Sequence, residues 1–318
     1  MQKIRFGVIS TAKIGREKVI PAMHQSSLCD VTAIASRSMD RAENMASKMG
    51  IEKYYGSYEE LLTDSDVDAV YIPLPNNMHI SWTKRALKAG KHVLCEKPIG
   101  CRAEEAEDLM RFKQGYTDLL VMEAFMYRFH PQWKKVKALV QHGKIGKMRL
   151  VDCQFSYYKT DPENIRNQPE KGGGAMLDIG CYCINAARYL FDEEPHTIKS
   201  NVEYDDALGV DRLCSGLLEF EQGQARFSCA SQLFGDQSVT IFGTKGKIII
   251  NEPFNNDPNE PVYLNLSTEE SEQPVQIEVD ACNHYKAQID AFADAIINGK
   301  SSPISLKDSL ANMKVIDA

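Results

Sequence analysis

The sequence lacks the features that mark several large classes of proteins. It has no run of the roughly 18 apolar residues that a membrane-spanning helix needs, and no apolar stretch of signal-peptide length near residue 1. It also has no run of five or six like charges, and its formal net charge is -7. These absences argue against membrane, secreted and nucleic-acid-binding proteins. We therefore expect a cytoplasmic protein with neither a membrane nor a nucleic acid as its partner.

A pattern of metal ligands is also missing. The nine cysteines are scattered and odd in number. Cys181 and Cys183 are spaced too closely for an ordinary zinc knuckle, and no second Cys/His pair accompanies them. We expect reduced thiols and no metal site.

The first part of the chain alternates between strand and helix patterns. At 318 residues the chain is long enough for two domains. Short apolar runs predict strands at 3–9, 30–36, 67–75, 91–98 and 119–124. Amphipathic segments between them predict helices, which end near residue 23 and then cover 39–49, 78–89 and 103–112. Repeated βαβ units predict a doubly wound parallel sheet over residues 1–123, with its ligand at the carboxyl ends of the strands.

The rest of the chain has a different order of predicted elements. Strand-like segments with glycine-containing turns follow one another, and few helices separate them. This pattern predicts an α+β second domain over residues 124–318, with a large, mostly antiparallel open sheet. The exceptions are predicted helices at 174–191, 283–299 and 305–316. The first of these follows three glycines, and it carries Asp178 and Tyr182 one helical turn apart on a shared face.

The first strand–helix turn has the sequence GVISTAKIG, residues 7–15. Ser10, Ala12 and Gly15 stand at the three glycine positions of a Gly-x-Gly-x-x-Gly dinucleotide fingerprint, so the motif alone is weak. A plain tight turn is the alternative. The position of the turn in the first βα unit favours pyrophosphate binding. The expected contacts are Ser10, Thr11, Ala12, Ile14 and Gly15.

The end of the second predicted strand indicates which cofactor is bound. A carboxylate there would bind the ribose 2'-hydroxyl of NAD, whereas an arginine accommodates the 2'-phosphate of NADP. The sequence has Ser36, Arg37 and Ser38 at this point, and Arg41 one turn later. NADP is therefore favoured, with NAD still possible. The alternative is a solvated loop arginine.

Two further strand ends should face the same crevice. The fourth strand runs into Glu96, Lys97 and Pro98, so Lys97 should point toward the cofactor rather than bulk water. A surface lysine is the alternative. The third strand supplies a second set of expected cofactor contacts, of which the last could equally cap or pack its own helix. They are Leu74, Pro75, Asn76 and His79.

The chain resembles the two-domain sugar oxidoreductases of the glucose-fructose oxidoreductase and inositol dehydrogenase (Gfo/Idh/MocA) family. The resemblance covers nearly the whole length, through VISTAKIG, ASRSMDRA, PLPNNMHISW, KHVLCEKPIG, MEAFMYRFHPQW, GGGAMLDIGCY and FGTKGKIIINEPF. Tyr182 stands where inositol-type members have histidine. The chain is thus similar to the branch with dimeric dihydrodiol dehydrogenase and NADP-dependent D-xylose 1-dehydrogenase. This resemblance implies hydride transfer between NADP and an aldose, a related cyclic polyol or a dihydrodiol.

The chemistry needs a group that handles a proton, because the cofactor handles the hydride. A free tyrosine has a pKa of about 10, and a nearby ammonium would lower that pKa. We expect Tyr182 as the general acid/base, assisted by Lys97 from the other domain, with Asp178 orienting the substrate or Lys97. The glycines would let the helix start approach the nicotinamide. The alternatives are a core tyrosine and a salt-bridged aspartate.

Other expectations concern the surroundings of this site. Tyr127, Arg128, His130 and Arg166 are expected around its mouth, with Arg166 counted among the cofactor contacts. We expect a homodimer that pairs the open sheets, because a bare apolar face is a hazard. A non-catalytic NADP-binding sensor or subunit and an NAD-dependent glycosidase are alternative functions on the same fold.

Overall fold

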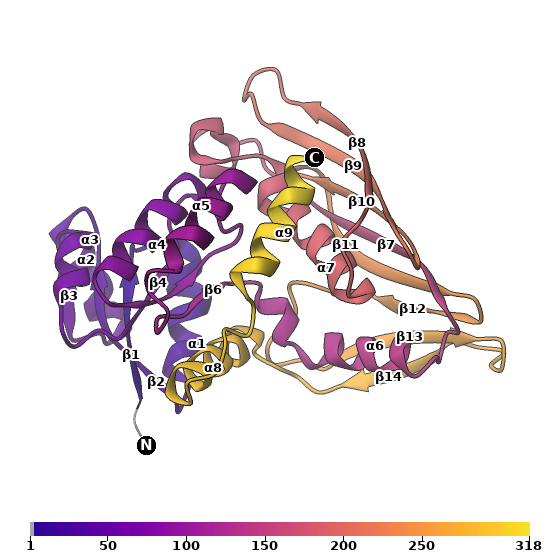
Figure 1. Ribbon diagram of the computed structural model, residues 1–318, viewed down its shortest axis with the longest axis horizontal. Helices are drawn as coiled ribbons and strands as arrows, with labels where there is room; N and C mark the ends of the chain where they lie inside the picture. The colour runs from indigo at the N-terminus through magenta and orange to yellow at the C-terminus, as the bar shows by residue number, and fades with distance from the viewer. Residues whose placement is uncertain (1–2) are drawn as a thin grey trace. The chain divides into compact units, whose positions relative to one another are not determined.

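The computed structural model describes residues 3–318, which form two compact units (Figure 1). The first unit contains the chain up to Met126 together with residues 285–310. The second contains residues 127–284 and 311–318.

The first unit is built on a six-stranded parallel sheet with the order β3-β2-β1-β4-β5-β6. Its strands are β1 Ile4–Ile9, β2 Cys29–Ala35, β3 Lys53–Tyr55, β4 Ala69–Ile72, β5 His92–Cys95 and β6 Val121–Glu123. The order reverses direction beside β1, and in such sheets ligands bind outside the carboxyl ends of the strands at this point. The predicted doubly wound sheet is confirmed.

Helices connect these strands, and every residue of β4 is buried, as expected for a parallel sheet covered on both faces. The helical segments of the first part of the chain are η1 Gly15–Val19, α1 Ile20–His24, α2 Met39–Met49, α3 Tyr58–Thr63, η2 Asn76–Met78, α4 His79–Lys88 and α5 Ala103–Lys113. Both α2 and α3 begin with a serine cap, Ser38 and Ser57, whose side chain accepts a hydrogen bond from the first helical turn.

The first unit also includes a late segment of the chain. In α8, His284–Ile297, the Phe292 ring lies 6.3 Å from the Phe6 ring of β1, and Asp290 accepts a hydrogen bond from Ser26 at 2.5 Å. Figure 1 shows α8 in yellow beside α1. The sequence prediction placed residues 124–318 in the second domain. In the structure, residues 285–310 cluster with the first unit, because α8 packs on the parallel sheet.

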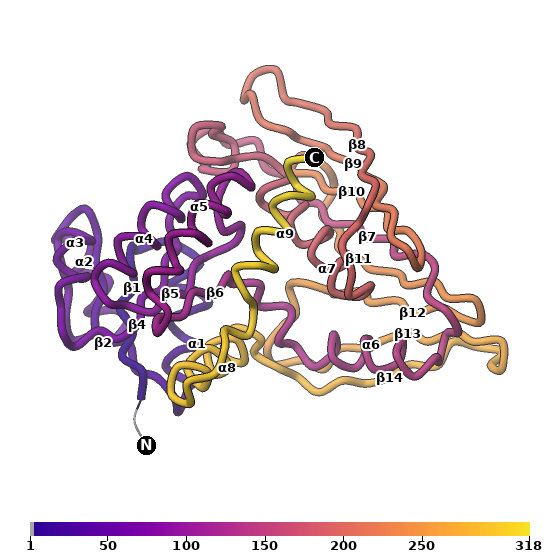
Figure 2. The backbone as a smooth tube through the Cα atoms, in the orientation of Figure 1, coloured from indigo at the N-terminus to yellow at the C-terminus, as the bar shows by residue number. Residues whose placement is uncertain are grey.

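The second unit is built on an eight-stranded sheet with the order β14-β13-β12-β11-β7-β10-β9-β8, whose path can be followed in Figure 2. The β7–β10 pair is parallel and the other pairs are antiparallel, so the predicted fold class is confirmed. The strands are β7 Met148–Tyr158, β8 Thr197–Tyr204, β9 Asp211–Phe220, β10 Gly223–Ala230, β11 Gln232–Gly243, β12 Gly246–Ile250, β13 Val262–Thr268 and β14 Val275–Val279.

One face of this sheet is covered by the predicted glycine-initiated helix. That helix consists of a π-helical turn, η6 Met176–Gly180, followed by α7 Cys181–Phe191, and both segments pack on β7 and β10. Alternate β7 residues such as Val151, Cys153 and Phe155 are buried. The other helical segments near this unit are η3 Met126–Phe129, α6 Pro131–Gln141, η4 Ile165–Asn167 and η5 Pro169–Lys171, and α9 Leu306–Asp317 crosses into it after Leu310.

Several short or exposed elements were missed by the sequence prediction. They are β3, α3, β8 and β14. β3 has only three residues, and most of β8 is exposed at the sheet edge, so neither has the apolar pattern that marks a strand.

Within residues 3–318, no helix is long and apolar enough to cross a membrane. The same residues contain no group of three or more His, Cys, Asp or Glu side chains arranged to hold a metal ion. The nine cysteines are free thiols, and seven of them are buried.

Candidate active site

The loop that carries Lys97 is anchored by the residue before it. The buried hydroxyl of Tyr71 in β4 donates a 2.6 Å hydrogen bond to Glu96 Oε1, and the Lys97 amide donates to Glu96 Oε2 at 3.4 Å. Burial, with the Glu96 charge beside it, raises the pKa of Tyr71 well above its usual value, so this tyrosine stays a proton donor. Glu96 thus fixes the loop, and the peptide between Lys97 and Pro98 is cis.

His79 fixes the same loop from the other side. Its ring is fully buried, with Nδ1 2.7 Å from the Pro98 carbonyl oxygen and Nε2 2.8 Å from the Leu74 carbonyl oxygen. Burial lowers the pKa of His79. The ring therefore ties together the loops that follow β4 and β5. This geometry favours the packing interpretation of His79 over a direct cofactor contact.

The first βα turn is made of small, half-buried residues. Ser10 has a φ of 116°, which is unusual for a residue with a side chain. Its hydroxyl donates to the Pro73 carbonyl at 3.2 Å and accepts from the Ala12 amide at 3.3 Å. Strained residues of this kind are concentrated at ligand clamps. The turn then leads into η1 at Gly15.

The predicted 2'-phosphate residues lie together at the start of α2. The Ser36 hydroxyl accepts from the Ser38 amide at 3.4 Å, and the Ser38 hydroxyl caps α2 by accepting from the Arg41 amide at 3.4 Å. Arg37 is exposed, and its positive charge acts on the Tyr58 hydroxyl. Two arginines, Arg37 and Arg41, therefore lie one before and one shortly after the cap of α2, and a capped helix start with positive residues suits an anion.

In the second unit, Asp178 lies at the centre of a hydrogen-bonded group. Its Oδ2 accepts from the Tyr157 hydroxyl at 2.8 Å and from Arg166 Nε at 2.7 Å. Burial, together with the Asp178 charge, raises the pKa of Tyr157, and that same charge is the main cause of the raised pKa of Arg166. Tyr157 and Arg166 therefore keep their protons and hold the carboxylate in place.

The ring of Tyr182 lies among other aromatic rings. Its centroid is 5.8 Å from those of Tyr127 and Phe155 and 5.3 Å from that of Phe254. The residue is 6% exposed. Such packing leaves the ring little freedom to turn, so the direction of its hydroxyl is well defined.

Two of the three glycines before η6, Gly173 and Gly174, lie against groups of their own unit. A Cβ on Gly173 would lie 2.6 Å from the Arg166 carbonyl oxygen, and one on Gly174 would clash with the Asp211 carboxylate. Asp211 in turn accepts a 2.6 Å hydrogen bond from the Met176 amide. Gly173 and Gly174 therefore let the helix start pack against Arg166 and Asp211, and the expected approach of the glycines to the nicotinamide stays a prediction.

Two residues expected at the mouth of the site lie inside the second unit instead. Tyr127 is fully buried and donates to Asn185 Oδ1 at 2.6 Å. His130 is also fully buried, and its Nδ1 caps α6 by accepting from the Gln132 amide at 3.2 Å. Neither side chain has surface for a ligand, because the apolar segment around them packs into the core.

Sequence reasoning placed Tyr157 at the end of the first strand of the second domain, near the expected site, but assigned it no role. It did not find Asp211. Asp211 carries no signal in the sequence, since its partners are backbone atoms of a segment 35 residues away in the chain.

Comparison with known proteins agrees with this architecture. Residues 4–123 match the model of an oxidoreductase family with an NAD-binding Rossmann fold, and residues 133–249 match the GFO/IDH/MocA C-terminal domain. The chain is 37% identical to a D-xylose 1-dehydrogenase (NADP(+)) of Haloferax volcanii, over 98% of this chain and 95% of that protein. The chain belongs to the Gfo/Idh/MocA family. It is therefore an oxidoreductase with an NAD-binding Rossmann domain.

Other members of the Gfo/Idh/MocA family are similar over most of the chain. A trans-1,2-dihydrobenzene-1,2-diol dehydrogenase of Xenopus tropicalis is 34% identical over 77% of this chain and 74% of its own. The crystal structure of KijD10, a 3-ketoreductase from Actinomadura kijaniata in complex with NADP and TDP-benzene, superposes with a TM-score of 0.93. It is 31% identical and covers 100% of this chain and 97% of that one.

Proposed function

We propose that this chain is an NADP-dependent oxidoreductase that transfers hydride between the nicotinamide and an aldose sugar or a related cyclic polyol or dihydrodiol. The observation that carries the proposal is the start of the second unit's helix. There an immobilised tyrosine, Tyr182, follows one turn after a carboxylate, Asp178, that two donors hold in place.

The residues of the first unit fit the cofactor. The turn at Ser10 to Ala12 presents small side chains and an unusual φ, and the first amides of a helix have no partner within the helix. Arg37 and Arg41 beside the capped start of α2 would hold the 2'-phosphate. The cofactor, when bound, supplies or accepts the hydride.

Side chains of the protein would transfer the proton to or from the reacting oxygen of the substrate. We assign Tyr182 the role of general acid/base for the reacting oxygen. We assign Lys97 the task of favouring the phenolate form, because a nearby ammonium lowers the pKa of a phenol from its usual value of about 10. Asp178, fixed by Tyr157 and Arg166, would orient a substrate hydroxyl.

The test is turnover by point variants with an intact cofactor site. Tyr182→Phe and Lys97→Ala should each lower kcat by about 10²- to 10⁴-fold, the usual contribution of acid–base catalysis, in an assay of reduced nicotinamide absorbance. The dissociation constant for NADP should change little in Tyr182→Phe. If wild-type protein binds NADP but turns over no sugar, polyol or diol, the chain is a sensor or subunit instead.

The similarity to KijD10 favours a second candidate on the same site, reduction of a 3-keto sugar nucleotide. That protein is named a 3-ketoreductase and was crystallised with a TDP compound. A panel of free aldoses, cyclic diols and nucleotide-linked keto sugars, each assayed with NAD and with NADP, would decide between the candidates. A kcat/KM highest for free aldoses supports the first.

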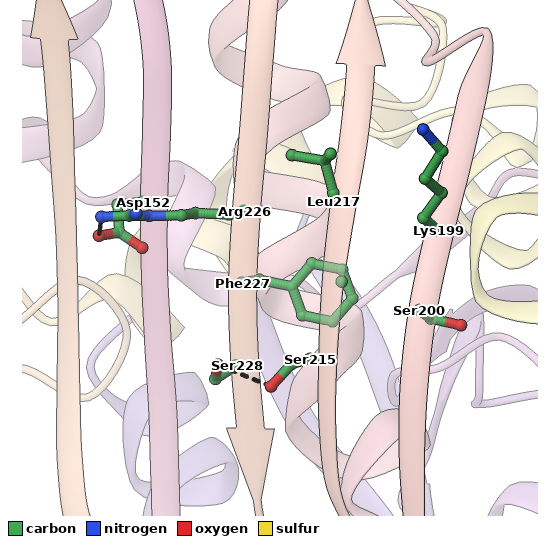
Figure 3. A pocket seen from close by; sticks show the side chains of 9 residues that line it. Asp152, Lys199, Ser200, Ser215, Leu217, Arg226, Phe227 and Ser228 are labelled. Carbon is green, nitrogen blue, oxygen red and sulfur yellow. Dashed lines mark hydrogen bonds and ion pairs between the residues drawn. The ribbon is translucent and has the colours of Figure 1, made fainter.

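We also propose that the chain forms a homodimer through the open face of its eight-stranded sheet. Strands of this sheet carry exposed apolar residues, among them Phe234 and Tyr204, which agrees with the reason first expected for a dimer. The sheet also contains a hollow of about 450 Å³, shown in Figure 3. An ion pair of 2.7 Å joins Arg226 to Asp152 there, and Leu217 and Lys199 line the same hollow. No residue of α7 lines this hollow, so a partner bound there would leave the proposed catalytic residue Tyr182 uncovered.

Sedimentation velocity would test the dimer. Leu217→Asp should shift wild-type dimers toward monomers, because it puts a charge in the middle of the face. The matched control is Met39→Asp, which changes an exposed apolar residue of the first unit that is 48% accessible. A monomeric wild type, or equal effects of both variants, would contradict this proposal.

A further inference from the structure

The terminal nitrogens of the Arg166 guanidinium make no hydrogen bond within the described part of the protein. Its Nε donates to Asp178 at 2.7 Å, yet neither Nη1 nor Nη2 makes a hydrogen bond to any of residues 3–318. The side chain is 44% exposed, while that of its partner Asp178 is 13% exposed. A guanidinium held by one edge therefore presents four N–H donors outward.

The backbone of Arg166 is held as firmly as its side chain. Its amide donates to Asn164 Oδ1 at 3.1 Å, and its carbonyl oxygen accepts from the Gly174 amide at 2.8 Å. Gly173 packs directly against that carbonyl, where a Cβ would not fit. The glycine run thus fixes the position of Arg166, and the outward pair of nitrogens is preorganised for a ligand.

The charges around Arg166 indicate what that ligand is. Asp178 is paired with the guanidinium, and Asp211 lies close enough for the Asp178 charge to act on it. Burial is the main cause of the raised pKa of Asp211, and the neighbouring carboxylate adds to it. The Asp178 carboxylate therefore already balances the charge of the guanidinium, and the Asp211 carboxyl lies near that carboxylate. A phosphate or carboxylate would gain little from such a balanced pair and would meet the charge of Asp178, whereas uncharged hydroxyl oxygens can accept from both Nη atoms.

We propose that Arg166 determines substrate specificity by donating from Nη1 and Nη2 to two neighbouring hydroxyl oxygens of an uncharged substrate. The alternative is the cofactor contact expected from the sequence, and the NADP affinity of an Arg166 variant distinguishes the two roles. The inference rests on the proposed oxidoreductase function, since it deepens the description of the same site. Tyr182 lies within electrostatic range of the guanidinium, so the bound hydroxyls would lie near the group that handles the proton.

The experiment compares Arg166→Gln and Arg166→Lys with a control, Arg149→Gln, at the far end of β7, where Arg149 donates to the Gln222 carbonyl. Each protein is assayed with a free aldose, its monodeoxy analogues and its phosphorylated and carboxylated derivatives. NADP affinity is measured separately by fluorescence titration. Thermal unfolding checks that every variant folds.

We expect Arg166→Gln to lower kcat/KM for the aldose by about 50-fold, the size expected when hydrogen bonds to a charged donor are lost. For at least one monodeoxy analogue the loss should fall below about threefold, because the oxygen that Arg166 binds is already absent. Arg166→Lys should recover little, since lysine lacks the planar fork. The control and the NADP dissociation constants should stay within about twofold of wild type.

Three results would overturn the inference while leaving the proposed function standing. They are an equal loss on every deoxy analogue, a loss of NADP affinity in Arg166→Gln, and a wild-type preference for phosphorylated or carboxylated sugars. Absence of turnover by wild type on every sugar would instead overturn the proposed function, and this inference with it.

Discussion

Two helices in this molecule begin with the same backbone conformation, a π-helical turn, but differ in whether they need glycine there. Both η1, in the first unit, and η6, in the second, are π-helical turns that lead into an α-helix. A Cβ on Gly15, at the start of η1, would meet no atom closer than 3.7 Å. A Cβ on Gly174, just before η6, would clash with Asp211, and the φ of 113° is itself strained for any other residue.

The difference shows that glycine is optional in one turn and required in the other. In the proposed function the first turn would bind the cofactor through its backbone amides, and Ser10 and Ala12 already stand where a dinucleotide fingerprint has glycine. The second turn is filled by the protein itself, which uses the missing side chains to bring Arg166, Asp178 and Asp211 together. Packing therefore does not require glycine at position 15, whereas it does at positions 173 and 174.

The largest expected effect is that of Gly174→Ala. Strain at a positive φ and overpacking against a buried carboxylate each cost about 1–3 kcal/mol, so we expect a loss of about 4 kcal/mol in the free energy of unfolding, or no folded protein. Urea denaturation measures it. Gly50→Ala is the control, because Gly50 has a φ of 67° with nothing within 4 Å of a Cβ. It should cost about 1 kcal/mol. If both variants lost a similar amount of unfolding free energy, close packing against Asp211 would not be the reason for glycine at position 174.

This pair of turns also shows what the sequence could and could not predict. The alternation of short apolar runs and amphipathic segments was enough for the parallel sheet, the antiparallel sheet and the helix that carries Asp178 and Tyr182. It could not reveal that Gly173 and Gly174 serve Arg166 and Asp211, since those contacts join residues far apart in the chain. Nor could it place Tyr127 and His130 in the core, because polar aromatic residues suit a binding site equally well.

The start of α6 is also buried inside the protein, where the His130 side chain caps it. The contribution of this cap to stability should depend on pH. Burial lowers the pKa of His130 to about 4, whereas an unfolded histidine has a pKa of about 6.5. As the pH falls below 6.5, the unfolded chain takes up a proton that the folded one does not, so stability is lost between pH 6.5 and 4. The loss attributable to His130 should be about 2 kcal/mol at pH 5 relative to pH 8.

The variant His130→Asn isolates this contribution, because asparagine caps a helix but does not titrate in this range. Its unfolding free energy, followed in urea at pH 8 and pH 5, should fall by about 2 kcal/mol less than that of wild type over the same interval. An identical pH dependence in both proteins would mean that His130 is protonated in the folded state, and that this helix start is not closed to solvent.

A smaller effect is expected at Ser10 in the first turn. Its φ of 116° favours glycine, while its hydroxyl makes hydrogen bonds with the Pro73 carbonyl and the Ala12 amide. Ser10→Gly loses those bonds but relieves the strain, whereas Ser10→Ala loses the bonds and keeps it. The glycine variant should therefore be more stable by about 1 kcal/mol in urea denaturation. An alanine variant of equal stability would mean that the turn is free to relax.

The smallest effect should be that of Gly15→Ala, and it tests the comparison most directly. The added methyl group would lie 3.7 Å from the Tyr71 ring and 3.8 Å from Pro73, ordinary contact distances that need no movement. Alanine also has the higher helix propensity, so the free energy of unfolding should stay within about 1 kcal/mol of wild type. Titration with NADP should give a dissociation constant within about threefold, because the turn amides remain where they were. If the variant bound NADP tenfold more weakly with unchanged stability, Gly15 would be needed to leave space for the ligand. Both turns would then require glycine, although only the second requires it for packing.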